Sequence, residues 1–584
     1  MNWAWSPAVL PASSWKCSSE PLRDFAPHRQ PLSPLILSPL ALPVGFFDGR
    51  SRRASRLSRV RAGPGITAVH LLRTRADLWR WRHQAERLHF VPTMGALHAG
   101  HQSLIERASL ASAGSAGARV LVSVFVNPLQ FAPGEDFDRY PRSLEQDAAL
   151  AADAGADALF APSLEDLYPE GEPELTRVQP PDSLQGCLCG RHRPGHFNGV
   201  ATVVLRLLGL IRPDQLLLGE KDWQQLVIVR RVVRDLGLPV QVVGCPTRRD
   251  PDGLAMSSRN RYLSETQRRQ ALALPQALAA ARRSARAGEA LAERCAAVRL
   301  ELEAAGLMVD YVEAVEPRTL RPRSHLRGLT LLAAAVHCGP SRLIDHQFLM
   351  SRQPIVAIDG PAGAGKSTVT RAFAERLGLI YLDTGAMYRA VTWLVQHHGI
   401  EAGDADAVAA LLSGLDLQLS TAAAGGQRVS VNGHDVTEAI RSPEVTAQVS
   451  VVAAHGCVRA ALTAQQQAMG ERGGLVAEGR DIGTAVFPDA ELKVFLTATV
   501  GERARRRALD LEQRGFAVPP LAELEAQIAE RDHLDASREV APLTQAEDAE
   551  ELISDGLSIE AVIERLVQLF RERVPEEAWP APNA

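Results

Sequence analysis

The sequence predicts an α/β protein with two successive nucleotide-binding units, and three observations lead to this fold class. Short apolar runs such as 120–126 and 215–218 alternate with helix-like segments such as 102–109 and 223–236, which is typical of a parallel sheet covered by helices. A second strand pattern starts abruptly near residue 354 and runs into a glycine-rich loop. The 584 residues also correspond to about four folding units at roughly 150 residues each.

The composition favours small phosphorylated ligands over nucleic acid. Apolar residues make up 46% of the chain and charged residues 23%, which excludes a chain that is disordered throughout. Residues 1–65 hold nine basic and three acidic side chains, a charge of +6, whereas the rest holds 55 basic and 65 acidic ones, a charge of −10. A net acidic folded part lacks the broad positive surface that sequence-independent nucleic-acid binding requires, so we expect no nucleic-acid partner.

Residues 1–65 are expected to form a disordered extension, because they are rich in Pro, Ser and Arg and show no helical or strand period. An organellar transit peptide or an overlong reading frame would look similar, so the role of this segment stays open. Its most apolar stretch, 35–47, is interrupted by prolines and too short to span a bilayer, so we expect no membrane partner. The seven scattered cysteines favour reduced thiols and a cytoplasmic location.

The rest of the chain is expected to contain three domains. Residues 66–245 show the alternating pattern of a parallel α/β domain. Residues 246–350 hold a long Ala/Arg/Glu-rich helical region followed by strand-like 309–315 and 329–336, which predicts a smaller α+β domain. A new α/β domain then covers 351–584, with hardly any linker before its first strand.

Two histidines stand three residues apart where the strand before them gives way to a helix. At this spacing, nearly one helical turn, His98 and His101 would face the same side at the positive end of the helix. Gly100 between them allows close backbone approach. The pattern predicts a triphosphate site.

Polar residues follow two of the predicted strands and would join this site. Asn127 and Gln130 follow the strand 120–126, and residues 219–222 follow the strand 215–218. Ligands of open α/β sheets bind at the carboxyl ends of the strands, so these segments should converge on one crevice. The loop 252–260 carries two serines and an arginine and could close over a leaving pyrophosphate.

Together these segments resemble the pantothenate synthetases, the pantoate:β-alanine ligases of the nucleotidyltransferase superfamily, over about residues 66–348. The resemblance is carried by PTMGALHAGH at 92–101, FVNPLQF at 125–131, RPGHF at 193–197, GEKDWQQ at 219–225 and MSSR at 256–259. It implies a Rossmann-like nucleotidyltransferase domain with a small α+β domain, and a homodimer formed through them. It also implies a reaction in which pantoate and ATP give pantoyl adenylate and diphosphate, after which β-alanine displaces AMP to give pantothenate.

The resemblance also implies roles for individual residues. His98, His101 and Lys221 would stabilise charge on the α-phosphoryl group, with His101 as the proton donor. Gln130, Gln225 and Asn127 would hold pantoate and β-alanine. Arg248 departs from the family pattern, which has an apolar residue whose backbone meets adenine. The expected ATP-binding residues are Met94, Gly95, Ala96, Leu97, His98, Ala99, Gly100, His101, Gly219, Glu220, Lys221, Asp222, Arg248, Met256, Ser257, Ser258 and Arg259.

The segment GPAGAGKST at 360–368 lies between a predicted strand and a predicted helix, which is the context of a P-loop. Its glycines let backbone N–H groups point at the β-phosphate, Lys366 bridges phosphates, and the Ser367 hydroxyl reaches the Mg²⁺ that accompanies ATP. The expected ATP-binding residues of this loop are Gly360, Pro361, Ala362, Gly363, Ala364, Gly365, Lys366, Ser367 and Thr368.

The segments after the P-loop resemble the bacterial cytidylate kinases over about residues 353–573. The motifs are DTGAMYR at 383–389, EGRDIGT at 478–484, the arginines of 503–507 and ERDHLDASR at 530–538. The resemblance implies a P-loop nucleoside monophosphate kinase domain with a CMP-binding insert and a lid, which transfers phosphate from ATP to CMP or dCMP. Lys366 and Asp481 would be catalytic, and the lid residues that contact ATP would be Arg503, Arg506 and Arg507.

The expected CMP site is rich in arginine. Asp535 would accept a hydrogen bond from the cytosine amine, where uracil presents a carbonyl. Ser450 and Arg459 would read the base as well. The expected CMP-binding residues are Thr384, Arg389, Ser450, Arg459, Arg480, Asp481, Arg531, Asp535 and Arg538.

The sequence therefore predicts a bifunctional enzyme of pantothenate (coenzyme A precursor) biosynthesis and pyrimidine nucleotide metabolism. Two other interpretations stay open. The same folds could act on other acceptors, as another adenylylating ligase joined to a uridylate or adenylate kinase. One half could instead be a nucleotide-sensing scaffold, although the intact His101, Lys221, Lys366 and Asp481 argue against it.

Overall fold

The computed structural model describes residues 58–60, 69–113, 117–421, 427–513, 515, 517–538, 540–580 and 582. Most of the extension expected at 1–65 lies outside these residues. Within it, Ser58–Val60 forms strand β1 and pairs with β2, which differs from the expected lack of secondary structure. The described residues from 58 onward belong to one compact unit.

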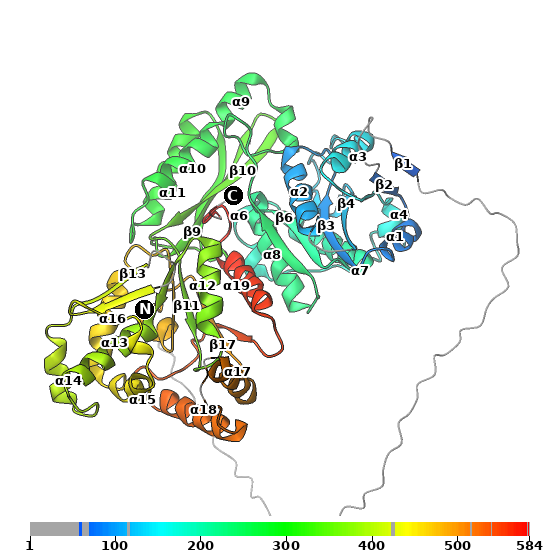
Figure 1. Cartoon of the computed structure of the whole chain (residues 1–584). Helices are drawn as coiled ribbons and strands as arrows, with labels where there is room; N and C mark the ends of the chain where they lie inside the picture. Colours follow the sequence, from blue (N-terminus) through cyan, green and yellow to red (C-terminus); the bar gives the residue numbers. More distant parts are fainter. Residues whose placement is uncertain are drawn as a thin grey trace, which may run out of the picture. The chain divides into compact units, whose positions relative to one another are not determined.

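The first sheet has seven strands in the order β1-β2-β5-β4-β3-β6-β7, and all pairings except β1 with β2 are parallel. Its central strands are apolar along most of their length because both faces are covered, as expected for a parallel sheet. The predicted strands at 120–126 and 215–218 correspond to β4 and β6 (Figure 1). The strands are β1 Ser58–Val60, β2 Val69–Leu72, β3 Arg87–Thr93, β4 Ala118–Val124, β5 Ala158–Phe160, β6 Gln215–Gly219 and β7 Gln241–Cys245.

Helix α7 fixes the turn that follows β4. A Cβ on Gly199 would lie 2.1 Å from the carbonyl oxygen of Leu129, so glycine allows α7 to pack directly on the turn η1 that ends in Gln130. The helices of this part are α1 Arg75–Arg82, α2 Ala99–Ala113, α3 Leu144–Asp153, α4 Leu164–Leu167, α5 Asp182–Gln185, α6 Leu188–His192, α7 His196–Ile211 and α8 Trp223–Asp235, with the single turns η1 Pro128–Gln130 and η2 Glu220–Asp222.

A three-stranded antiparallel sheet in the order β10-β9-β8 follows, and helices α9, α10 and α11 lie along it (Figure 1). This is the α+β arrangement that the sequence predicts for 246–350. Apolar side chains of α10, α11 and the sheet form a core of their own. The elements are η3 Ser258–Tyr262, α9 Glu265–Ala271, α10 Ala273–Arg283, α11 Leu291–Ala304, β8 Met308–Val315, β9 Leu329–Cys338 and β10 Ser341–Met350.

The third sheet has five parallel strands in the order β12-β16-β11-β17-β18. The glycine-rich loop joins β11 to α12, as the sequence predicts. A Cβ on Gly360, whose φ is +148°, would lie 2.0 Å from the Leu496 carbonyl oxygen, so the loop can leave β11 only with glycine there. The elements are β11 Ile355–Asp359, α12 Lys366–Leu377, β12 Ile380–Asp383, β16 Leu475–Gly479, η5 Ile482–Val486, β17 Leu492–Thr497, α17 Val500–Gln513, α18 Leu521–Ala536, β18 Glu550–Ile553 and α19 Ile559–Arg573.

A helical and antiparallel insert lies between β12 and β16. No single helix among the described residues is long and apolar enough to cross a membrane, although α15 and α16 reach that length and composition as a pair bent by 99°. The elements are α13 Thr384–His397, α14 Ala405–Leu412, β13 Leu417–Thr421, β14 Gln427–Val431, β15 His434–Asp435, η4 Ala439–Arg441, α15 Pro443–Val452 and α16 Gly456–Met469. The architecture as a whole is the predicted α/β class with two parallel sheets.

Candidate active sites

His98 and His101 lie beside each other at the start of α2, with ring centroids 4.1 Å apart. The backbone N–H of Gly100 donates to His98 Nδ1 at 3.1 Å, so the first imidazole also caps the helix. Burial and the neighbouring Lys221 lower the pKa of His98 to about 4, and burial with the charges of His98 and Lys221 lowers the pKa of His101 to about 3. Both imidazoles are therefore neutral at neutral pH until an anion binds.

Asp147 of α3 holds the turn that precedes these histidines. Its side chain is 1% exposed and accepts hydrogen bonds from the backbone N–H groups of Ala96 at 3.1 Å and Leu97 at 2.8 Å. Burial raises the pKa of Asp147. The sequence analysis missed this residue, and the available signal was an acidic residue on the alanine-rich face of a predicted helix.

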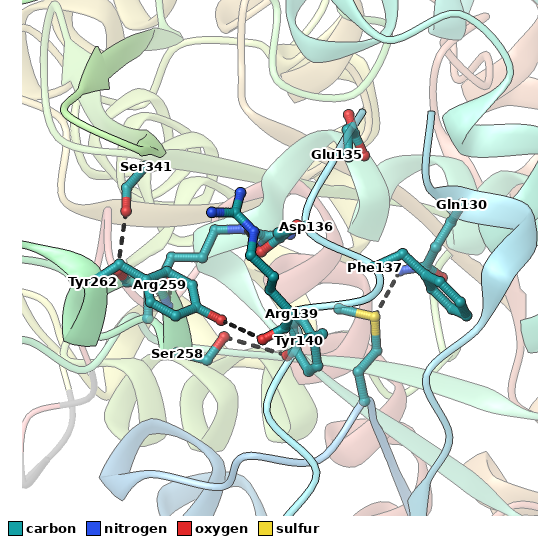
Figure 2. Close-up of polar contacts among 12 residues, drawn as sticks. Gln130, Glu135, Asp136, Phe137, Arg139, Tyr140, Ser258, Arg259, Tyr262 and Ser341 are labelled. Atoms are coloured by element: carbon teal, nitrogen blue, oxygen red, sulfur yellow. Dashed lines mark hydrogen bonds and ion pairs between the residues drawn. The ribbon is translucent and has the colours of Figure 1, made fainter. Parts of the chain in front are cut away.

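Gln130 is held with its backbone anchored and its amide directed at the site. Its carbonyl oxygen lies 2.8 Å from His196 Nδ1 and accepts from Arg193 at 3.3 Å. Its side-chain amide contacts the sulfur of Met94 at 3.0 Å (Figure 2). Asn127 is 1% exposed and its amide bonds to Gly199 and Tyr168, so it serves mainly to hold this turn.

These side chains surround one cavity of about 270 Å³ at the carboxyl ends of β3, β4 and β6. Five residues from the expected ATP-binding set do not line it: Gly95, Ala96, Leu97, Ala99 and Glu220. The residues from the sequence-based set that line it are Met94, His98, Gly100, His101, Asn127, Gln130, Gly219, Lys221, Asp222, Gln225, Arg248, Met256, Ser257, Ser258 and Arg259.

Glu220 points away from this cavity. It is 2% exposed, and its carboxylate accepts from the backbone N–H of Glu577 at 3.3 Å. The reason is geometric: consecutive residues of the single turn η2 face different directions, so Lys221 reaches the cavity while Glu220 faces the protein interior. Burial, with the charge of Glu577, raises the pKa of Glu220 to about 7.

In the P-loop, Lys366 is buried and its ammonium donates to the carbonyl oxygens of Gly360 and Pro361, both at 2.8 Å. Burial, together with the charge of Arg480, lowers the pKa of Lys366 to about 7. The Ser367 hydroxyl donates to Glu478 at 2.5 Å. The loop is therefore closed on itself, with its lysine available to an incoming phosphate.

A second cavity, of about 620 Å³, adjoins the P-loop and is lined by arginines that are paired with carboxylates. Arg480 contacts Asp535 at 2.9 Å, and Arg389 contacts Asp383 at 3.1 Å. Gly360, Pro361, Ala364 and Arg503 from the expected sets do not line this cavity. The residues that do are Ala362, Gly363, Gly365, Lys366, Ser367, Thr368, Thr384, Arg389, Ser450, Arg459, Arg480, Asp481, Arg506, Arg507, Arg531, Asp535 and Arg538.

Comparison with known proteins gives consistent matches to both halves. Residues 66–348 match the family model of pantoate-beta-alanine ligase, and residues 356–572 match that of cytidylate kinase. The crystal structure of pantothenate synthetase from Thermus thermophilus is 49% identical, covers 47% of this chain and 98% of its own, and has a TM-score of 0.44.

Full-length relatives carry both halves in one chain. The bifunctional pantoate ligase/cytidylate kinase of Prochlorococcus marinus (strain MIT 9313) is 66% identical over 503 residues, which are 86% of this chain and 99% of the relative. The protein of the same name from Parasynechococcus marenigrum (strain WH8102) is 67% identical over 495 residues, 85% of this chain and 96% of its own. The chain belongs to the bifunctional pantoate ligase/cytidylate kinase family. We refer to residues 66–348 as the ligase half and to 356–572 as the kinase half.

In the ligase half, two loops close one side of the cavity by bonding to each other. Figure 2 shows Arg259 facing Asp136, with two contacts of 2.8 and 3.0 Å between guanidinium and carboxylate. The Tyr140 hydroxyl lies 3.2 Å from the hydroxyl of Ser258. Asp136 and Tyr140 were not identified from the sequence, because their loop has no periodic pattern and their partners are more than 100 residues away.

In the kinase half, Arg503 joins the P-loop to the helices expected to form the lid. It is 4% exposed, pairs with Asp532 at 3.0 Å and donates to the carbonyl oxygen of Ala362 at 3.2 Å. Arg506 donates to Ala364 and Ser554, whereas Arg507 pairs with Asp510 near the surface. Arg503 therefore holds the loop from behind, in contrast to its expected contact with ATP.

Proposed function

We propose that the ligase half condenses pantoate with β-alanine through a pantoyl adenylate, giving pantothenate, AMP and diphosphate. The observation that carries this proposal is the single cavity in which His98, His101 and Lys221 face the amides of Gln130 and Gln225. Cationic and neutral donors at one end suit a triphosphate, and amides at the other suit a small hydroxy acid that both donates and accepts hydrogen bonds.

In the first step, the pantoate carboxylate attacks the α-phosphorus of ATP and diphosphate leaves. Charge that develops on the α-phosphoryl oxygens would be stabilised by Lys221 and by N–H groups of the two imidazoles at the positive end of α2. The low pKa values of the free imidazoles mean that bound phosphate must supply the charge that protonates them. His101 is then a proton donor created by substrate binding.

In the second step, the β-alanine amine attacks the acyl carbon of the adenylate and AMP leaves. The loop that carries Ser257, Ser258 and Arg259 would exclude water during both steps, which matters because the mixed anhydride would otherwise hydrolyse. The bonds of Arg259 to Asp136 and of Ser258 to Tyr140 support a closed position of this loop.

For the kinase half, the proposed reaction is phosphoryl transfer from ATP to CMP or dCMP. The observation that carries it is that the P-loop and the arginine-rich residues share one cavity. Positioning and charge neutralisation supply most of the catalysis in such reactions, and arginines suit both. ATP would enter with Mg²⁺, for which the Ser367 hydroxyl and the Glu478 carboxylate are suitable oxygen ligands at the P-loop.

The test is phosphorus NMR of the full-length protein with Mg-ATP and CMP, before and after pantoate and β-alanine are added. We expect CDP and ADP at once, and AMP with diphosphate only after the second addition. Absence of CDP, or absence of AMP from folded protein, would refute the proposal for the corresponding half. UMP and AMP in place of CMP test the alternative acceptors.

Domain boundaries, location and assembly complete the proposal. The boundaries are 66–245, 246–350 and 351–584, and limited proteolysis followed by mass spectrometry would check them. We also propose a cytoplasmic location and a homodimer through the ligase half, which light scattering on the full-length protein would test against a monomer.

A further inference from the structure

The segment 574–579 follows α19 and lies beyond both family matches, but it is firmly held in the kinase half. Val574 is fully buried, and its N–H donates to the carbonyl oxygen of Phe570 at 2.6 Å. The indole N–H of Trp579 donates to the Leu377 carbonyl oxygen at 2.8 Å. These two anchors fix the segment at both ends, so the residues between them have a defined direction.

Between these anchors, two glutamates reach the ligase half. The Glu577 carboxylate accepts a hydrogen bond of 2.6 Å from the backbone N–H of Thr247 and forms an ion pair of 3.3 Å with His346 Nε2. The Glu576 carboxylate pairs with Arg107 of α2 at 2.6 Å. The side chains of His346 and Glu577 are only 3% and 14% exposed, so this contact is enclosed.

The backbone held by Glu577 leads directly to residues of the ligase cavity. Thr247 and Arg248 both line that cavity, and the Arg248 carbonyl oxygen accepts from the Met256 N–H at 2.9 Å. On the other side, Asp345 holds Arg249 with contacts of 2.7 and 2.9 Å. Residues 247–249 are thus fixed at both ends, and the anchor at Thr247 comes from the C-terminal segment.

Glu577 also reaches the second strand end of the same site. Its backbone N–H donates to the carboxylate of Glu220 at 3.3 Å, and the next residue, Lys221, lines the cavity. One residue of the C-terminal segment therefore bonds to both elements that flank the expected ATP position, the turn after β6 and the strand end after β7.

The charge state of the contact agrees with this geometry. Burial alone would raise the pKa of Glu577, but His346 and the N–H of Thr247 lower it to about 2. Burial alone would lower the pKa of His346, but Glu577 raises it. The two groups therefore form a charged pair, and removal of the carboxylate would leave the imidazole and the Thr247 N–H without their buried partner.

We infer that Glu577 is a positioning residue for the ligase half, which holds residues 247–248 and 220–221 in place for ATP. This inference rests on the function proposed for that half. It means that the ligase site is completed by a segment that follows the kinase half, so the two halves depend on each other structurally although neither uses the other's product.

The experiment compares full-length wild type with Glu577→Gln and Glu577→Ala in steady-state kinetics. AMP formation with pantoate and β-alanine reports on the ligase half, and CDP formation reports on the kinase half. Glu564→Gln is the matched control, because Glu564 lies on the preceding helix α19 and its carboxylate pairs with Arg376 of the kinase half at 2.6 Å.

We expect the ligase KM for ATP to rise roughly tenfold in Glu577→Ala, with kcat changed less than about twofold, because a charge-assisted hydrogen bond is lost. Glu577→Gln should lie between wild type and Glu577→Ala, since its amide oxygen can still accept from Thr247. The KM for pantoate, both kinase constants and the Glu564→Gln control should match wild type.

Three results would overturn the inference. An ATP KM within twofold of wild type in both variants would do so, as would a loss of kcat with unchanged KM and a lower melting temperature, which indicates a merely structural contact. If Glu577→Ala does not fold, an unchanged ATP KM in folded Glu577→Gln would decide against it. A wild-type protein that forms no AMP would refute the proposed function instead.

Discussion

The side chains of Arg459 and Asp481 form an ion pair that is almost completely enclosed, with exposed fractions of 4% and 5%. The guanidinium also lies 5.5 Å from the centre of the Tyr388 ring. Asp535, the carboxylate expected to read cytosine, is instead paired with Arg480 and Arg538. Because Arg459 is itself expected at the base, its partner Asp481 is the better placed carboxylate for the cytosine amine.

We therefore predict that Asp481→Asn lowers discrimination between CMP and UMP more than Asp535→Asn does. The asparagine amide can donate to the uracil carbonyl, so kcat/KM for CMP should fall at least about tenfold relative to that for UMP. Asp535→Asn should lower both values together. Initial rates with each nucleotide measure this, and a larger loss of discrimination in Asp535→Asn would restore the sequence-based assignment.

A second prediction concerns the independence of the two chemical steps. His101→Ala should lower pantothenate formation about 100-fold, the usual cost of one transition-state donor, while CDP formation stays within twofold of wild type. The assay is product quantification by chromatography on the same protein sample. Circular dichroism would verify folding, and loss of both activities in folded His101→Ala would contradict the prediction.

Much of the fold and of both cavities could be predicted from the sequence because the information is local. The strand and glycine-rich loop at 355–365, and the paired histidines at the start of α2, each lie within a dozen residues. The resemblance to two families supplied the remaining positions, and most of them line the two cavities. Glu220 and Arg503 are exceptions, because side-chain direction within a turn or helix depends on packing that a motif does not encode.

The residues that were missed act across long sequence separations. Asp147 holds a turn 50 residues earlier, Asp136 pairs with Arg259, and Glu577 bonds to Thr247 across 330 residues. Each is an acidic residue in a segment without a recognisable motif. Their roles emerge only when tertiary structure brings a backbone N–H group or a guanidinium to the carboxylate.

The pair of Asp136 and Arg259 gives a third prediction. The ion pair is bidentate and partly buried, so Asp136 should act on catalysis by holding Arg259 over the ligase cavity. Asp136→Ala and Arg259→Ala should each lower ligase kcat/KM about tenfold or more, and the double variant should be no worse than Arg259→Ala. Additive effects in this double-mutant cycle would show that the two residues act independently.

The last prediction uses the buried lysine of the P-loop. With a pKa of about 7, Lys366 is mostly neutral at pH 8 in the free protein, and a bound triphosphate should raise that pKa and protonate it. ATP binding to the kinase half should therefore take up nearly one proton at pH 8 and almost none at pH 6, where the lysine is already charged.

Calorimetry of Mg-ATP binding in two buffers with different ionisation enthalpies would measure this proton uptake. Lys366→Arg is the matched control, because arginine stays charged in both states and should bind without uptake from this position, while protons taken up by the ligase half are common to both proteins. Since the bound form holds the extra proton, ATP affinity of the kinase half should weaken as the pH rises from 7 to 9. Equal proton uptake by wild type and Lys366→Arg at pH 8 would show that Lys366 is already charged before ATP arrives.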